Sequence, residues 1–522
     1  MPLCQRWFQQ CCTSHEGCIP DKAYQSFIPT RLLDITRDRP RLCLAEEVTS
    51  VGLPVRYATL SHCWGTVAFA TLNSANIDSF RQLIPPEALV KTFLDAMHVA
   101  RALDFSYLWI DSLCIIQDSA EDWEREAGLM ADVYGGSSLT IAASSAADGR
   151  VGCFFDRPKS WRCQVRQSDS PVLWNVFPFT LHDINGHKLR DRAWALQERY
   201  LSRRVLHFTR DQVFWECDGA PACETYPKGY PVEVYLALAE PDFDPGFALQ
   251  KRPLTREAWP AIVEDYSSRR LTKKSDRFPA IGGLAKLIQE QTKDEYIAGM
   301  WMEGLEDQLT WRVKSSRYVK SSEARTLAPD AVAPYIAPSW SWASTTGHVD
   351  YPRKLNEEDL AKSYLYVEVH AIHIQFPSAN PLGEIVGATL RLWCQNLYCG
   401  VTRILEEPHP TFMSFSVGDR VVIPQFWVFP DSLVASAKDT LVDTYILPIR
   451  HGMGLLRCQG LILQPTGRLK GQYRRIAAYE HVREDLSAGL LGEENLVARD
   501  CVDHFSEVTT EGGVKRYIID LV

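Results

Sequence analysis

Three apolar segments, separated by amphipathic stretches, constrain the fold of this chain more than any other feature. Residues 56–62, 107–113 and 138–143 have the length and apolar character of buried strands. The stretches between them have the apolar spacing of helices. Strand–helix–strand order at this spacing predicts right-handed crossovers and a parallel arrangement. We therefore expect an α/β fold in which helices flank a mostly parallel sheet.

Both intervening stretches also carry signals for helix starts. The Pro-Pro-Glu sequence at residues 85–87 is expected to open the first helix, since proline is tolerated in a first turn. Ser119 is expected to cap the second helix, with Asp122 as an acidic capping-box residue three positions later. A later helix over residues 191–202 and a strand over residues 205–208 are expected to extend the sheet.

Changes in sequence character divide the chain into four parts. Residues 1–50 form an N-terminal extension, and residues 51–225 carry the α/β pattern. Residues 226–350 begin with a proline-rich linker and are then mainly helical. Residues 351–522 contain stretches of alternating apolar and polar residues, which predict antiparallel strands and a β-rich C-terminal domain.

The composition limits the class of protein. Of the 522 residues, 46% are hydrophobic and 23% are charged, as in a folded globular protein. The net charge of -9 argues against a nucleic-acid-binding surface. The sequence shows no apolar run of the roughly 18 residues that a membrane helix needs and no signal-peptide core. We therefore expect a cytoplasmic protein whose 15 cysteines are mostly reduced thiols.

One group of cysteines has the density of a metal site. Cys11, Cys12, His15 and Cys18 all lie between residues 11 and 18. Thiolate and imidazole groups at such spacing are able to bind Zn²⁺ tetrahedrally. However, no second CxxC or HxxxH pair follows at the distance typical of a zinc finger. We therefore predict no metal at these residues, and we interpret them as local packing of a short N-terminal segment.

Polar residues gather where two of the predicted strands end. Ser-His-Cys-Trp-Gly follows the first strand at residues 61–65, and Asp-Ser-Leu-Cys follows the second at residues 111–114. Ligands usually bind at the carboxyl ends of strands in an open α/β sheet. The glycine would let the backbone approach a ligand closely, and the helix after Ser119 would direct its positive end at the same crevice. The candidate ligand-binding residues here are Ser61, Trp64, Gly65 and Cys114.

A third block, Arg-Ala-Trp-Ala-Leu-Gln-Glu-Arg at residues 192–199, is expected to form a helix. Arg192 is a candidate partner for Asp111 or for a ligand phosphate. Glu198 lies where it would close the site. An ion pair that only joins the helix to the sheet explains the same residues equally well.

Together, these blocks resemble the fungal heterokaryon incompatibility (HET) domain. Segments similar to other parts of the family follow in the same order: Tyr266-Ser-Ser-Arg-Arg-Leu-Thr, Asp276-Arg-Phe-Pro-Ala-Ile-Gly-Gly-Leu-Ala, Tyr296-Ile-Ala-Gly-Met-Trp and Ala337-Pro-Ser-Trp-Ser-Trp-Ala-Ser. In the first block, His62-Cys63 replaces the Tyr-x pair of the commonest family form, LSYxWG. The resemblance extends over residues 25–350.

The resemblance implies an effector in fungal self/non-self recognition and regulated cell death. The HET fold is similar to TIR-type domains, some of which hydrolyse NAD, so a TIR-like or flavodoxin-like sheet and NAD as a substrate are expected by analogy. The same analogy assigns catalytic carboxylates to Glu126, Asp111 and Glu198. Simple structural roles also explain such carboxylates. Asp111 would hydrogen-bond backbone amides at a strand end, and Glu124 and Glu126 would be solvated helix residues favoured by the helix dipole. A diverged member of the family without a role in incompatibility would carry the same motifs.

Two other functional hypotheses stay open. A Cys-His hydrolase would use Cys63 or Cys114 as its nucleophile, with His62 or His207 as the base. Neither thiol, however, lies in a glycine-flanked nucleophile elbow. A non-catalytic module would act through self-association or a protein partner. In that case, the Ser-Trp-Ser-Trp segment at residues 339–342 is either an exposed interface or a buried anchor.

Overall fold

The computed structural model describes most of the chain, and that part divides into two compact units. Unit 1 comprises residues 1–253 with 269–271, and unit 2 comprises residues 254–268 with 272–522. The finer four-part division stays a prediction. The described residues are 1–18, 27–50, 55–157, 163–166, 173–176, 187–231, 254–314, 335–352, 357–378, 380–406, 411–417, 420–431, 441–451, 458–481, 507–511 and 514–522.

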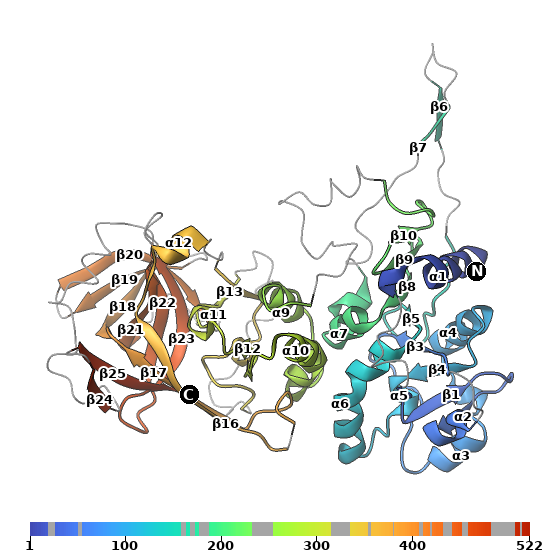
Figure 1. The fold of residues 1–522 in the computed structure, drawn as a ribbon, viewed down its shortest axis with the longest axis horizontal. Helices are drawn as coiled ribbons and strands as arrows, with labels where there is room; N and C mark the ends of the chain where they lie inside the picture. The colour runs from blue at the N-terminus through green and yellow to red at the C-terminus, as the bar shows by residue number, and fades with distance from the viewer. Residues whose placement is uncertain are drawn as a thin grey trace. The chain divides into compact units, whose positions relative to one another are not determined.

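Unit 1 is built on an eight-stranded sheet in the order β10-β9-β8-β5-β3-β4-β1-β2 (Figure 1). The four central strands β8, β5, β3 and β4 run parallel, whereas the pairs at both edges are antiparallel. The sheet is therefore mixed, and the expectation of a mostly parallel sheet is only partly confirmed. Short connections join β1 to β2, β8 to β9 and β9 to β10, which antiparallel neighbours allow and parallel neighbours do not. The strands are β1 (Arg31–Asp34), β2 (Arg41–Leu44), β3 (Tyr57–Ser61), β4 (Tyr107–Ile110), β5 (Leu139–Ala142), β8 (Arg204–Phe208), β9 (Val213–Cys217) and β10 (Ala222–Cys223).

The order of the parallel strands creates a switch point between β3 and β5. The chain leaves β3 for β4 on one side and then returns past β3 to reach β5 on the other side. Taken in chain order, the parallel strands have the flavodoxin-like arrangement 2-1-3-4. Figure 1 shows α4 (Lys91–Ala102) and α6 (Ala120–Gly136) on opposite sides of this sheet. In such sheets, ligands bind outside the carboxyl ends of the strands at the switch point.

The helices of unit 1 follow the predicted pattern with two differences. Ser119 caps α6, because its side chain accepts a hydrogen bond from the backbone N–H of Asp122 at 3.2 Å. The helix predicted to open at the Pro-Pro pair was placed too early: α4 begins at Lys91, because Leu89 and Val90 are extended after a separate turn. The strand predicted over residues 107–113 ends at Ile110, where a helical turn begins. The remaining helices are α1 (Pro2–Ser14), α2 (Ala45–Thr49), α3 (Ile77–Gln82), α5 (Asp111–Cys114) and α7 (Trp194–Leu201), with the turns η1 (Glu16–Cys18), η3 (Pro86–Ala88) and η4 (Lys188–Asp191); β6 (Cys163–Arg166) and β7 (Leu173–Val176) form a separate hairpin.

Unit 2 begins with helices and short strand pairs. Its helices are α9 (Trp259–Ser267), α10 (Pro279–Thr292), α11 (Leu305–Gln308) and α12 (Glu357–Ala361), with the turns η6 (Lys274–Arg277) and η7 (Trp342–Ser344). The short strands β11 (Tyr296–Ile297) and β12 (Met300–Trp301) pair with each other, as do β13 (Arg312–Val313) and β14 (Val349–Asp350). Nowhere in the described ranges is a helix both long and apolar enough to cross a membrane.

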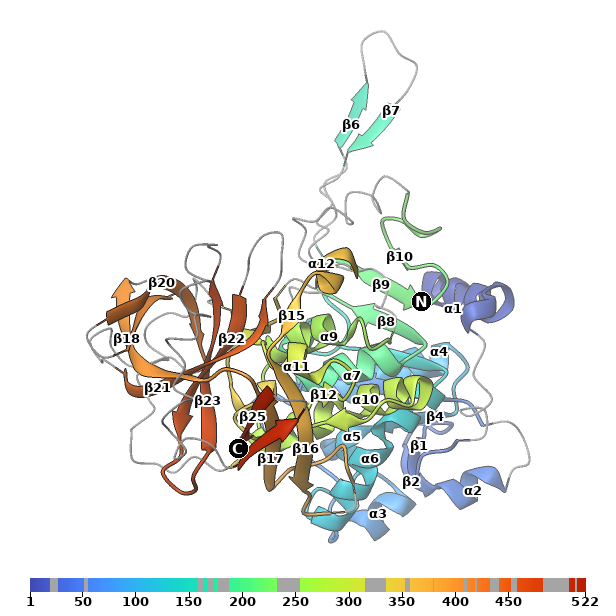
Figure 2. The same ribbon diagram turned by 60° about the vertical axis from the view of Figure 1, so that its left-hand side comes forward.

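Six antiparallel strands of unit 2 close into a barrel (Figure 2). The ring runs β18-β19-β20-β23-β22-β21 and returns to β18. Closure of a sheet on itself removes exposed edges. The predicted β-rich C-terminal domain is therefore confirmed. The ring strands are β18 (Tyr398–Glu406), β19 (Thr411–Val417), β20 (Arg420–Pro430), β21 (Leu441–His451), β22 (Cys458–Pro465) and β23 (Gln472–His481); outside the ring lie β15 (Tyr364–Leu365), β16 (Val367–Gln375), β17 (Gly387–Cys394), β24 (Glu507–Glu511) and β25 (Val514–Leu521).

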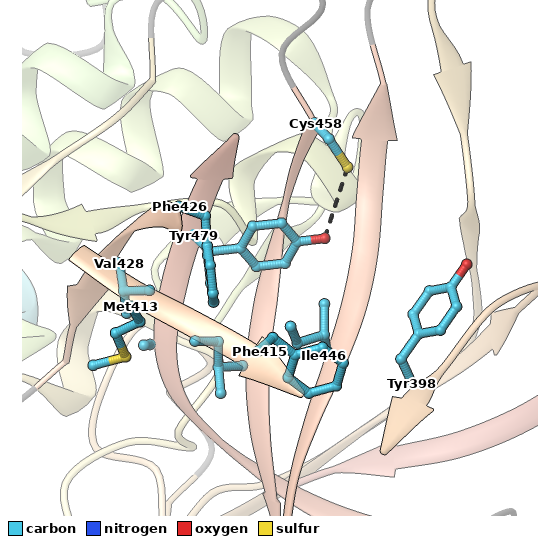
Figure 3. Close-up of a cluster of buried hydrophobic side chains, with 10 residues drawn as sticks. Tyr398, Met413, Phe415, Phe426, Val428, Ile446, Cys458 and Tyr479 are labelled. Carbon is cyan, nitrogen blue, oxygen red and sulfur yellow. Dashed lines mark hydrogen bonds between the residues drawn. The ribbon is translucent and has the colours of Figure 1, made fainter. Parts of the chain in front are cut away.

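Every strand of this ring contributes to one buried cluster (Figure 3). Its large members include Phe415 from β19, Phe426 from β20 and Tyr479 from β23, each at most 2% exposed. The thiol of Cys458 lies 3.7 Å from the hydroxyl of Tyr479. The cluster members of β19, β20 and β23 lie two positions apart on each strand, as expected for the inward face of a barrel.

The Ser-Trp-Ser-Trp segment is buried inside unit 2. Trp340 and Trp342 are both fully buried, and the indole N–H of Trp342 donates to the carbonyl of Gly299 at 2.7 Å. The backbone N–H of Ser339 donates to the carbonyl of Val522 at 3.1 Å. The exposed-interface hypothesis for this segment is therefore wrong. The segment is instead a buried anchor: Ser339 bonds to Val522, and the indole of Trp342 bonds to Gly299.

Candidate functional site

The first two sequence motifs meet at one edge of the sheet of unit 1. β3 ends at Ser61, and the neighbouring parallel strand β4 ends just before Asp111. The register pairs Leu60 with Ile110, so the residues that follow both strands emerge side by side. Parallel pairing therefore produces the convergence that the sequence pattern predicts.

Asp111 is the centre of this convergence. Its carboxylate accepts hydrogen bonds from the indole N–H of Trp64 at 2.9 Å and from the backbone N–H of Ser112 at 2.7 Å. Arg192 donates to the same carboxylate at 3.0 Å. Burial alone would raise the pKa of Asp111, but His62 and Arg192 outweigh it and hold the pKa below its usual value. Asp111 is therefore an ionised, fully bonded carboxylate.

Arg192 links this carboxylate to a second one. Its guanidinium donates to the backbone carbonyl of His62 and lies 3.9 Å from the carboxylate of Glu198 on α7. Glu198 also accepts a hydrogen bond from the hydroxyl of Ser61. Burial raises the pKa of Glu198 above its usual value, and Arg192 offsets this only in part. The third block therefore joins the first two through one guanidinium.

His62 has an unusual environment in this cluster. Its ring is 1% exposed and packs edge-on against Phe93 and Phe69, with centroids 5.2 and 6.3 Å away. Burial lowers the pKa of His62 to about 4. Among the described residues, neither ring nitrogen has a hydrogen-bond partner, and Nδ1 lies 3.7 Å from Asp111. The sequence motif includes His62, but only the fold shows that its ring lies among apolar side chains.

Two predicted site residues belong to a different cluster. Glu126 is 1% exposed and lies 4.0 Å from Arg31 and 3.3 Å from Arg125. Arg31 also donates to the carbonyl of Cys114 at 2.7 Å and to Asp122 at 3.1 Å. The fold therefore places Glu126 and Cys114 around Arg31. The solvated-helix explanation for Glu126 is wrong, whereas Glu124 is indeed exposed.

Gly65 serves a tight turn. Its φ is +70°, and a Cβ atom at this position would lie 2.4 Å from the Cβ of Asp148 and 3.0 Å from the carbonyl of Ala147. Only glycine adopts this conformation without strain and also fits this space. The space beside Gly65 that the sequence suggested for a ligand is therefore occupied by residues 147 and 148.

A recess opens at the switch point beside Ser61. Its cavity volume is about 30 Å³, and it is partly open to solvent. Such a volume is small beside the roughly 300–1,000 Å³ of ligand sites. The wall of the recess includes residues near the carboxyl ends of β3, β5 and β8, namely Ser61, Ala142, Ser144 and His207. Three arginines also line it: Arg190, Arg199 and Arg269. The arginines were not selected from the sequence, although Arg199 ends the third block.

Residues 57–198 match the family model described as heterokaryon incompatibility protein (HET). This protein contains a HET domain. The match extends from the first residue of β3 to Glu198 and therefore includes Asp111 and Arg192. No curated protein and no solved structure matches the chain significantly.

Neither of the two cysteines considered as nucleophiles has surroundings in the HET domain that favour a reactive thiolate. Cys63 packs against the apolar cluster around Ala142, and burial raises its pKa to about 11. Burial also raises the pKa of Cys114. The ring nitrogens of His207 lie 3.2 Å from Ser144 and 2.8 Å from Glu216. Since the thiolate is the nucleophilic form, these surroundings argue against a Cys-His hydrolase.

The chemistry available in the HET domain therefore centres on two unlike carboxylates. Asp111 is stabilised as an anion, whereas Glu198 is shifted toward its protonated form. Environments that push two pKa values apart are typical of acid–base sites. Ser61 contacts Glu198 and also lines the recess, so Ser61 connects this buried carboxylate to the wall of the recess.

Proposed function

We propose that this HET-domain protein is an effector in fungal self/non-self recognition and regulated cell death, and that it cleaves a nicotinamide dinucleotide. The family match supports the first part of the proposal. The arginine-rich recess at the switch point supports the second, and it is the single observation that carries it. Guanidinium groups bind phosphates with paired hydrogen bonds, so such a lining suits the pyrophosphate of a dinucleotide. Arg199 is also paired with Glu216 at 2.8 Å.

In this proposal, Glu198 is the catalytic carboxylate, and Glu126 is not. Glu126 is held in the cluster around Arg31, whereas Glu198 contacts Ser61 in the wall of the recess. The bond between ribose C1′ and the nicotinamide nitrogen breaks, and a water oxygen bonds to C1′. Glu198 accepts the proton of that water, as a carboxylate with a raised pKa suits. The products are nicotinamide, ADP-ribose and one proton.

One observation favours a second candidate function, a non-catalytic module. The carboxylates of Asp111 and Glu198 are both buried and both interact with Arg192. Such a cluster would also serve only to fasten α7 to the ends of β3 and β4. On this alternative, the protein acts through self-association or through a protein partner.

The decisive experiment is NAD⁺ turnover by the purified full-length protein, with chromatography of the products. We expect the wild-type protein to release nicotinamide and ADP-ribose. Glu198→Gln should lower turnover roughly 100-fold or more, the usual effect of losing a general acid or base. Glu124→Gln is the matched control, because Glu124 is exposed on α6, and it should keep wild-type turnover.

Folded wild-type protein that releases no nicotinamide, even at high protein concentration, would refute the enzymatic part. The effector role is then tested separately, by expression of the same variants in fungal cells. Toxicity that persists in Glu198→Gln, together with self-association in light scattering, would support the non-catalytic module instead.

A further inference from the structure

We infer that Cys11, His15, Cys18 and Cys217 form a structural Zn²⁺ site in unit 1. The ligand atoms of these four residues lie within 4.8 Å of one another. Three thiolates and one imidazole are a common donor set of structural zinc sites. The inference does not depend on the proposed function, because these residues lie outside both the recess and the cluster around Asp111.

The fold brings the four ligands together from two distant parts of the chain. Cys11 lies in the last turns of α1, and His15 is the extended residue that caps this helix. Cys18 ends the turn η1 that follows. Cys217 is the last residue of β9, 202 positions after His15. Figure 1 shows α1 beside β9, and Figure 2 agrees. The expectation of no metal rested on a missing second ligand pair, but one distant cysteine completes the set.

The geometry of the cluster fits a tetrahedral metal. The thiol of Cys217 lies 3.4 Å from Nδ1 of His15. Zinc–sulfur and zinc–nitrogen bonds of roughly 2.3 and 2.05 Å place two tetrahedral ligands about 3.5 Å apart. Cys11, Cys18 and Cys217 are buried, and His15 is half-buried. Four protein ligands leave no open position, so the site is structural and not catalytic.

The surrounding groups stabilise thiolates at this place. Arg204 is 5% exposed; its guanidinium donates to the sulfur of Cys11 at 3.1 Å and to the carbonyl of Cys18 at 2.7 Å. Three thiolates around Zn²⁺ carry one net negative charge, which this guanidinium balances. The backbone N–H of Ala220 donates to the sulfur of Cys217 at 3.4 Å. Outer hydrogen bonds of this kind orient metal ligands and tune their charge.

The turn after Cys217 is shaped to admit the imidazole. A Cβ atom at Gly219 would lie 2.6 Å from Nδ1 of His15, so a larger residue would push the imidazole away. Bound zinc would therefore fasten the N-terminal helix to an edge strand of the sheet.

The test begins with the zinc content of the full-length protein, purified without a polyhistidine tag or chelator under reducing conditions. We expect about one Zn²⁺ per chain in the wild-type protein. Cys217→Ser and His15→Ala should lose most of it. Cys12→Ser is the matched control, because Cys12 is exposed in the same helix and lies outside the cluster. This variant should keep the wild-type zinc content.

Cobalt substitution gives a second readout that does not depend on the variants folding. Wild-type protein reconstituted with Co²⁺ should show the intense visible bands of a tetrahedral centre and thiolate charge-transfer bands in the near ultraviolet. Wild-type protein with little zinc and no such spectrum would overturn the inference. So would full zinc content in folded Cys217→Ser, or a disulfide that joins two of these cysteines in the native protein.

Discussion

The guanidinium of Arg192 lies 3.0 Å from the carboxylate of Asp111, although 81 positions separate the two residues in the chain. The same guanidinium binds the carbonyl of His62 and approaches Glu198. One side chain therefore connects all three sequence motifs of the HET domain. This relationship explains why the motifs occur together, whether the cluster also performs chemistry or only holds the domain together.

Arg192→Gln should destabilise unit 1 strongly. The substitution leaves the buried carboxylate of Asp111 without its cation, and breaking a buried ion pair in this way costs about 3–5 kcal/mol. Chemical denaturation followed by tryptophan fluorescence would measure the loss. Lys188→Gln is the control, because Lys188 and Asp191 are 3.8 Å apart and more than half exposed. Equal stabilities of the two variants would show that Arg192 adds nothing to the fold.

The free energy of unfolding of unit 1 should decrease as the pH is lowered from 6.5 to 4. The pKa of His62 is lowered to about 4 by burial, so the folded protein binds fewer protons than the unfolded chain in this window. Stability from the neutral imidazole is thus fully present above pH 6.5 and is lost as the pH falls toward 4. The loss attributable to His62 approaches about 3 kcal/mol.

The contribution of His62 is isolated by comparing pH profiles of thermal unfolding. His62→Gln should have a shallower pH dependence than the wild-type protein between pH 4 and 6.5. His98→Gln should keep the wild-type profile, because His98 is exposed on α4. Parallel profiles for wild-type protein and His62→Gln would contradict the assignment.

Two glycine substitutions should have opposite effects on unit 1. Gly65→Ala forces a side chain into a left-handed conformation and against Asp148, so we expect destabilisation of at least about 2 kcal/mol. Gly128→Ala should instead stabilise by about 0.5–1 kcal/mol, because Gly128 lies in α6 with open space around its Cβ position. Melting temperatures of the first unfolding transition would decide. Unchanged stability of Gly65→Ala would contradict the role of Gly65, and lowered stability of Gly128→Ala would contradict the second prediction.

Features that depend on neighbouring residues could be predicted before the fold was known. Helix capping at Ser119 follows from the side chain of one residue and the N–H groups just after it, so a local pattern predicts it. The parallel central strands follow from the alternation of strands and helices. Their pairing then requires Ser61 and Asp111 to emerge at the same edge, so the convergence of the two motifs was also predictable.

Contacts between groups that are distant in the chain could not be predicted in this way. Glu126 lies with Arg31, and Cys217 lies beside His15, although nothing near these residues in the sequence indicates their partners. Similarly, the sequence around residues 340 and 342 does not indicate whether their indoles are buried or exposed. Local signals act over a few residues, whereas these contacts depend on strand order and on how each helix packs against the sheet. Strand order and helix packing depend on the whole chain, so a short sequence pattern does not predict these contacts.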